Sequence, residues 1–194
     1  VEWEFNENIP YEGTSTAPDR DRINPAYFAK LDSIFEFGLA QGMTFELILF
    51  NYYDAAGLFH VPPMTDEQQE NFLRYLVARY TAYPNLALWT IANEYETYPD
   101  GKYLVQGTDV DWSKARATFI RSIDPYRHLI GTHPFAGYSL EGQPIVPGGT
   151  AGDLYGDYPD IDVLIQQHYG ANSGPDFLPR FGDAAGLEEG VAYD

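Results

Sequence analysis

The chain has no cysteine, which excludes a disulfide framework and any metal site built on thiolates. It also has few basic residues, 11 against 29 acidic ones, and a formal net charge of −18. Such a surface repels nucleic-acid phosphates and anionic membranes, so we expect neither as a partner. No apolar run approaches the ~18 residues of a membrane-spanning helix. No signal peptide is visible at Val1, and this tells little because the chain is expected to start inside a domain.

Several catalytic motifs are also missing. No glycine-rich phosphate loop follows any predicted strand, which disfavours a nucleotide-binding site. The sequence has no G-x-S-x-G elbow, which disfavours a serine hydrolase. It has neither H-E-x-x-H nor a close His-x-His pair, so we expect no cofactor and no catalytic metal. A structural calcium ion in the acidic loops stays open.

What the chain does have is enough apolar residues for a single folded domain and a surplus of aromatic ones. Apolar residues make up 44% of its 194 residues, and we expect one domain over 1–194. Aromatic residues make up 16%, with 16 Tyr and 12 Phe. Many belong to the core, but Tyr and Trp near loops suit a carbohydrate cleft, because the C–H faces of sugars stack on aromatic rings.

Predicted strands and helices alternate along the sequence, which indicates a parallel α/β sheet. Asn24-Pro25 marks one helix start, with Asn as cap, and Thr65 with Gln68 marks another as a capping box. A third helix is expected from Asp111 or Ser113, and 6–24 and 134–159 read as long loops. The expected strands are 1–5, 44–50, 86–92, 128–132, 161–166 and 190–193, with a further helix over 175–185.

Polar residues gather immediately after these strands, and a barrel would bring all of those strand ends to one mouth. The sequence therefore predicts a (β/α)8 TIM barrel. Only about six of the eight β/α units are present, so the chain is expected to be truncated at both ends. The polar residues at strand ends include Glu4, Asn6, Asn51, Tyr52, Asn93, Glu94, His133, His168 and Tyr169.

The segment 85–96 is the most informative of these strand ends. The apolar run 86–92 stops abruptly at Asn93-Glu94, as a buried strand does at a barrel rim. A carboxyl group held there by a rigid strand is suited to donating a proton. Taken alone, an Asn-Glu pair more often marks two solvated residues where a strand stops.

Other stretches agree with this segment and together resemble the clan A glycoside hydrolases, in the cellulase-like and apiosidase-like branch. The segments that carry the resemblance are 23–32, 41–43, 75–80, 83–85, 89–96, 124–127 and 132–134. Clan members are retaining enzymes on a (β/α)8 barrel, with Asn-Glu ending strand four and a second Glu ending strand seven. The resemblance covers nearly the whole chain and maps it onto strands two to seven.

The resemblance implies a catalytic role for Glu94, as general acid/base in hydrolysis of O-glycosidic bonds in an oligosaccharide or polysaccharide. It implies that Asn93 binds the sugar 2-hydroxyl. His168 or Tyr169 would contact the nucleophile or the sugar, and Trp89 is expected in the core. The other candidate substrate-binding residues are Asn51, Tyr52, His133, Trp3 and Glu96.

The chain departs from the clan pattern at its end. The nucleophile is expected at or just beyond Asp194, and no Glu follows. Asp194 could serve, but a Glu just beyond the chain end is favoured. The clan also implies a secreted or periplasmic protein with a carbohydrate as its partner, while the oligomeric state stays open. The competing interpretation is a non-catalytic carbohydrate-binding or inactive barrel fragment.

Overall fold

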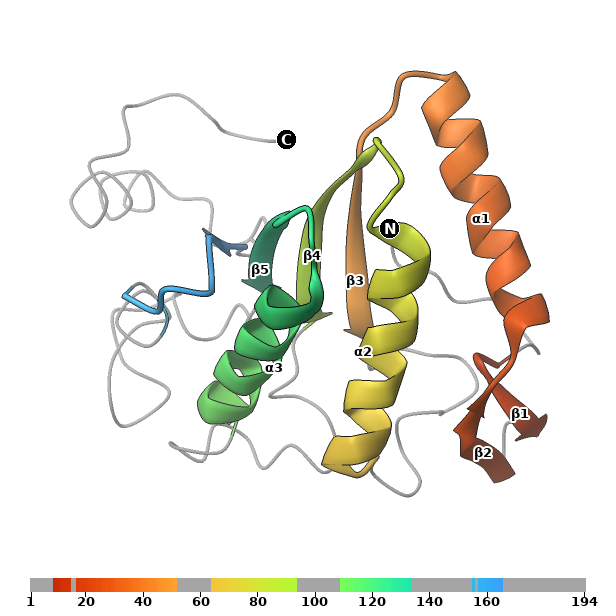
Figure 1. The fold of residues 1–194 in the computed structure, drawn as a ribbon, viewed down its shortest axis with the longest axis horizontal. Coiled ribbons are helices and arrows are strands. Elements are labelled where there is room, and N and C mark those ends of the chain that lie inside the picture. The colour runs from red at the N-terminus through yellow and green to blue at the C-terminus, as the bar shows by residue number, and fades with distance from the viewer. Residues whose placement is uncertain are drawn as a thin grey trace, which may run out of the picture.

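The computed structural model describes residues 9–14, 17–51, 64–93, 109–133, 155 and 157–165. Its centre is a parallel sheet of four strands in the order β3-β4-β5-β6. These are β3 (Phe45–Asn51), β4 (Leu86–Asn93), β5 (Leu129–His133) and the short β6 (Val163–Leu164). Figure 1 shows the sheet behind two helices, with a third helix to one side and the described carboxyl ends of β3, β4 and β5 toward the same end of the molecule.

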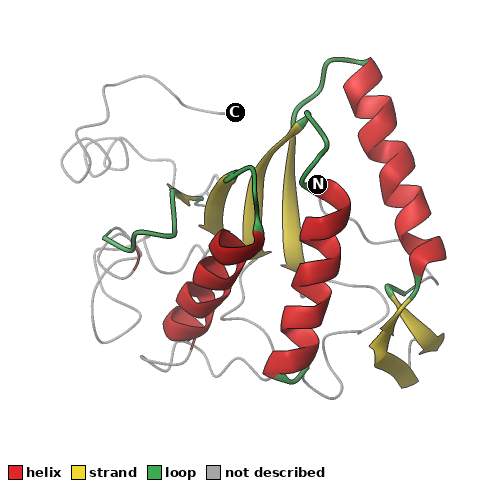
Figure 2. Cartoon of the chain, in the orientation of Figure 1, coloured by secondary structure: helices red, strands yellow, loops and turns green. Residues whose placement is uncertain are grey.

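The strands follow one another in chain order, and helices join the first three. Helix α2 (Asp66–Tyr80) connects β3 to β4, and α3 (Asp109–Ile123) connects β4 to β5. Both lie on the same face of the sheet (Figure 2). A doubly wound sheet reverses its strand order and carries helices on both faces, whereas a barrel wall keeps sequential order with its helices outside. The described sheet has the second arrangement, and closure into eight strands stays a prediction.

The two helix starts that the sequence predicts from capping residues are confirmed. Helix α1 (Pro25–Ala40) begins with Asn24, whose side chain accepts a hydrogen bond from the Ala26 N–H at 3.1 Å. It ends before Gly42, whose φ of +71° suits glycine. The capping box of α2 is present in both directions, from Gln68 N to Thr65 Oγ1 at 3.2 Å and from Thr65 N to Gln68 Oε1 at 3.1 Å.

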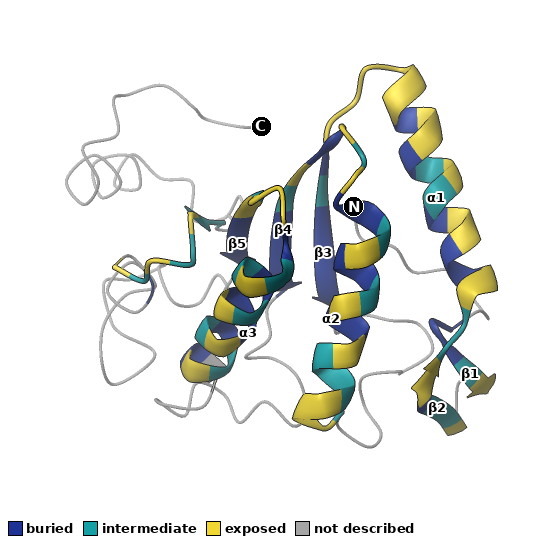
Figure 3. Ribbon diagram, in the orientation of Figure 1, coloured by how far each residue is buried: buried dark blue, intermediate teal, exposed yellow. Residues whose placement is uncertain are grey.

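The core lies between the sheet and the helices, and aromatic rings dominate it. The buried faces of the three helices turn toward the sheet (Figure 3). Phe35 of α1 packs at 5.0 Å between ring centroids against both Phe45 and Tyr80. Trp89 is fully buried, as the sequence predicts. The largest fully buried side chains also include Phe28, Phe72, Leu31, Leu47, Leu49, Leu73 and Leu76.

The predicted loop over 6–24 is wrong for most of its described length, because a β-hairpin forms there. Strand β1 (Tyr11–Thr14) pairs antiparallel with β2 (Ala17–Ile23). Gly13 takes a φ of +97°. Only Tyr11 and Arg20 of the two strands are buried, so the hairpin lacks the alternation of apolar residues that announces a strand.

Smaller differences concern element ends. Helix α3 starts at Asp109, before the expected Asp111 or Ser113, and β6 is limited to Val163–Leu164 rather than 161–166. Strands β3 and β5 each begin and end one residue later than expected. The predicted strands 1–5 and 190–193, the helix 175–185 and nearly all of the loop 134–159 lie outside the described residues. Among the described helices, none has the length and apolar character needed to cross a membrane.

Candidate functional site

The carboxyl ends of three neighbouring strands bring three of the predicted site residues together. In the sheet register, Asn51 of β3 pairs with Asn93 of β4, and Asn93 pairs with His133 of β5. Partners in register on neighbouring strands have Cα atoms roughly 5 Å apart. We refer to Asn51, Asn93 and His133 as the strand-end row. It forms because parallel strands joined by helices all finish at one edge of the sheet.

Asn93 and His133 of the strand-end row are shielded from solvent. The exposed fraction is 2% for Asn93 and 7% for His133. Asparagine and neutral histidine each offer both a donor and an acceptor. A row of this composition can hold hydroxyl groups, which also donate and accept.

An aromatic cluster supports the row from the helix side. The ring of Phe50, the residue before Asn51, lies 5.7 Å from Phe72 of α2 and 5.5 Å from Trp112 of α3, measured between centroids. Phe72 also packs against Tyr11 of the hairpin at 5.6 Å. Phe50 and Phe72 are buried, so this cluster packs the end of β3 against the helices.

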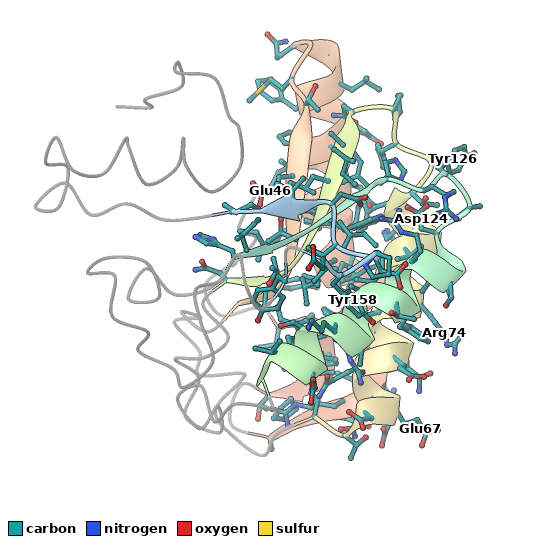
Figure 4. The ribbon with its side chains drawn as sticks, turned by 90° about the vertical axis from the view of Figure 1, so that its left-hand side faces the viewer. Glu46, Glu67, Arg74, Asp124, Tyr126 and Tyr158 are labelled. Carbon is teal, nitrogen blue, oxygen red and sulfur yellow. The ribbon has the colours of Figure 1, made fainter. Side chains whose placement is uncertain are left out.

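A polar pair lies on the other face of the sheet. Thr90 Oγ1 donates to Glu46 Oε1 at 2.5 Å. Side chains alternate between faces along a strand, and Trp89 points toward the helices, so Thr90 and Glu46 belong to the face away from them. Figure 4 shows Glu46 and Asp124 on opposite sides of the sheet. Glu46 lies at the start of β3, so it is distant from the strand-end row along the same strand.

The strongest electrostatic feature lies at the amino ends of the strands, around Asp124. Its carboxylate accepts from Thr81 Oγ1 at 2.5 Å, Trp89 Nε1 at 3.0 Å and His128 Nδ1 at 2.9 Å. It also accepts from the backbone N–H groups of His128 and Tyr126. Burial alone would raise the pKa of Asp124, but hydrogen bonds from Thr81, Trp89 and His128 outweigh it and hold the pKa at about 2. Asp124 is therefore an ionised anchor for the turn before β5.

The remaining predicted site residues lie outside the described part of the chain. The structure therefore brings together Asn51, Asn93 and His133 and leaves the other site predictions untested. Within the described ranges, no group of three or more His, Asp or Glu side chains is placed to hold a metal ion. The site residues outside the described ranges are Trp3, Tyr52, Glu94, Glu96, His168, Tyr169 and Asp194.

Sequence reasoning missed two residues that shape the described structure. It gave no role to His128, which bonds Asp124, and none to Gln69, which bonds Trp112 Nε1 through Oε1 at 2.7 Å. A half-buried amide on the inner side of a helix is a signal for Gln69, but its partner lies 43 residues away.

Comparisons with known proteins agree on the kind of fold and family. The model of a family described as "Apiosidase-like, catalytic domain" matches residues 2–168. A solved structure of a candidate glycoside hydrolase from Bacteroides vulgatus ATCC 8482 is 29% identical with a TM-score of 0.51, over 68% of this chain. This chain covers 24% of that one.

A family 5 glycoside hydrolase from the same organism is 21% identical, over 56% of this chain and 20% of that chain. Its TM-score is 0.40. A comparison with curated proteins found no significant match.

Proposed function

The chain belongs to the apiosidase-like catalytic domain family, and from this premise we propose that it is a retaining glycoside hydrolase with Glu94 as general acid/base. Its substrate would be an oligosaccharide or polysaccharide joined by O-glycosidic bonds. The family's name makes apiosides the first substrates to test. We further propose a single (β/α) barrel domain over 1–194 and secretion or a periplasmic location, both from the resemblance.

The observation that carries this proposal is the strand-end row. Asn93 stands in register between Asn51 and His133, and Glu94 is the next residue in the chain. In a barrel, the carboxyl ends of the strands form the mouth where the chemistry takes place. Glu94 would then act at the mouth to which the strand-end row belongs.

The proposed reaction uses two carboxyl groups. Glu94 protonates the oxygen of the leaving sugar while a second carboxylate, about 5–5.5 Å away, attacks the anomeric carbon. Glu94 then takes a proton from water as that water releases the sugar from the second carboxylate. Asp194, or a Glu beyond it, is the proposed nucleophile.

The strand-end row would bind the sugar during this reaction. The Asn93 amide donates to the sugar 2-hydroxyl, an interaction that strengthens in the transition state. Asn51 and His133 are the described candidates for contacts with the other hydroxyls. The other residues proposed to contact the sugar are Tyr52, His168, Tyr169, Trp3 and Glu96. The proposed reaction uses no cofactor or metal.

The experiment combines a substrate panel with one pair of variants. Para-nitrophenyl glycosides, including the apioside, identify a hydrolysed sugar, and proton NMR of the first product reads its anomeric configuration. Glu94→Gln should then lower kcat by about 10² to 10⁴-fold, because the amide can neither protonate the leaving oxygen nor take the proton from the attacking water. Glu67→Gln is the control, since Glu67 lies in the exposed first turn of α2 and should leave kcat unchanged.

The results separate the proposal from its competitors. A product of inverted configuration would refute retention, and full activity in Glu94→Gln would refute the acid/base assignment. Binding of the same sugars without any hydrolysis would favour the non-catalytic carbohydrate-binding interpretation.

A further inference from the structure

One glutamine joins the two chain segments that enter the helices from the site end of the sheet. Gln69 lies in the second turn of α2. Its Nε2 donates to the backbone oxygen of Met64, just before α2, at 3.0 Å. Its Oε1 accepts from Nε1 of Trp112, in the first turns of α3, at 2.7 Å. The amide uses its donor on one segment and its acceptor on the other.

The two segments joined by Gln69 follow the strands of the proposed site. Met64 ends the connection that leaves β3 after Asn51, and Trp112 follows the connection that leaves β4 after Asn93. Gln69 therefore sets the distance between the far ends of both connections. Neither leucine nor glutamate can replace it fully, because leucine has no polar atoms and an ionised glutamate has no donor.

Trp112 connects Gln69 to the strand-end row through its contact with Phe50. Its ring meets Phe50 nearly edge to face, with centroids 5.5 Å apart and an interplanar angle of 64°. The ring of Phe72 also packs against Phe50, with centroids 5.7 Å apart. Because Asn51 follows Phe50 directly, a shift of the indole moves the backbone that presents Asn51. The indole's only polar atom is held by Gln69, so the hydrogen bond selects one orientation of the ring.

Gln69 is not needed merely to keep α2 and α3 together. Arg116 of α3 already bonds Asp66 of α2 at 3.1 Å. The Arg74 guanidinium of α2 lies 4.7 Å from the centroid of the Phe119 ring of α3. These two contacts lie on either side of Gln69 along α2, so losing the amide would leave the helices joined and release the indole and the Met64 carbonyl.

The geometry points to Gln69 as a positioning residue of the proposed active site, which holds Trp112 against Phe50 and thereby fixes Asn51 for the sugar. This inference rests on the proposed glycosidase function. It concerns binding geometry, so its effect is expected mainly in KM and to a smaller degree in kcat.

The test uses the full chain and the para-nitrophenyl glycoside that it hydrolyses best. Gln69→Leu removes both hydrogen bonds, and Trp112→Phe removes only the N–H donor while keeping a ring beside Phe50. Each should raise KM by about tenfold, since small displacements of a binding group cost about that much or more. The double variant should be no worse than the poorer single one, because both remove the same bond.

Two further variants separate positioning from stability. Gln69→Glu keeps an acceptor for Trp112 and should recover most of the wild-type KM. Gln68→Ala is the matched control. It removes the half of the α2 capping box in which Gln68 Oε1 accepts from the Thr65 N–H, and the bond from Gln68 Nε2 to Asp21 Oδ1, so it should lower the melting temperature and leave KM unchanged.

Wild-type KM in both Gln69→Leu and Trp112→Phe would overturn the inference, as would a strictly additive double variant. If Gln69→Leu fails to fold, Trp112→Phe decides by itself. Failure of the proposed function looks different: Glu94→Gln would then retain full activity, or the wild-type chain would hydrolyse none of the panel.

Discussion

Replacing Asp124 by asparagine tests the most strongly perturbed carboxylate of the structure. Asp124 is buried, and its side chain accepts hydrogen bonds from Thr81, Trp89 and His128. Asparagine keeps the shape but turns one oxygen into an NH2 group. In the place of Oδ2, that group would face two donors, the Trp89 Nε1–H and the His128 backbone N–H.

The size of the effect follows from the pKa. The folded protein lowers the pKa of Asp124 from 3.8 to about 2. At 1.36 kcal/mol per unit, the ionised carboxylate stabilises the fold by about 2 kcal/mol. Opposed donors in the amide add about 1 kcal/mol. We therefore expect Asp124→Asn to lower the free energy of unfolding by about 3 kcal/mol at neutral pH.

The stability difference between wild type and Asp124→Asn should depend on pH in one direction. Because the folded pKa lies below the unfolded one, the carboxylate's contribution is complete above about pH 4 and is lost as the pH falls through about 2. Urea unfolding of both proteins at several pH values measures the difference. The gap between wild type and Asp124→Asn should narrow across this window, while the exposed Asp157→Asn control stays close to wild type throughout. A gap below about 0.5 kcal/mol at neutral pH, or one that widens in acid, would refute the reasoning.

Two further substitutions test local structure. Thr65→Ala removes the side chain that caps Gln68 N, so the free energy of unfolding should fall by about 1 kcal/mol in urea titration; no change would mean that the capping box does not contribute to stability. Gly13→Ala should destabilise the hairpin, because φ is +97° and an added Cβ would lie 2.5 Å from the Ala17 oxygen. Hydrogen exchange at Ala17 should then accelerate, and unchanged protection there would contradict the hairpin geometry.

The helices and the central strands could be predicted from the sequence because their signals are local. Asn24 and Thr65 bond to N–H groups two and three residues along the chain, so the caps are visible in the sequence itself. The β1–β2 hairpin could not be predicted in this way. Its burial comes from Tyr11 packing on Phe72 of α2, far along the chain.

In the candidate site, too, the features with local sequence signals could be predicted and those that depend on distant residues could not. The strand-end row could be predicted because a polar residue after an apolar run marks a strand end, and parallel strands align their ends. The supports of the site and the anchor at the opposite end could not. Gln69 is hydrogen-bonded to Trp112, 43 residues away, and Asp124 is hydrogen-bonded to Trp89, 35 residues away. Such pairs depend on the packing of elements, which no local pattern specifies.

The most direct test of the central claim is how Glu94→Ala responds to the leaving group and to azide. A general acid matters for a poor leaving group and much less for a good one, because a phenolate with low basicity departs without protonation. We predict a loss of about 10² to 10⁴-fold with an alkyl glycoside, a much smaller loss in glycosylation with a dinitrophenyl glycoside, and rescue by azide to a glycosyl azide of retained configuration. Equal losses with both substrates and no azide product would contradict the assignment of Glu94 as the acid/base.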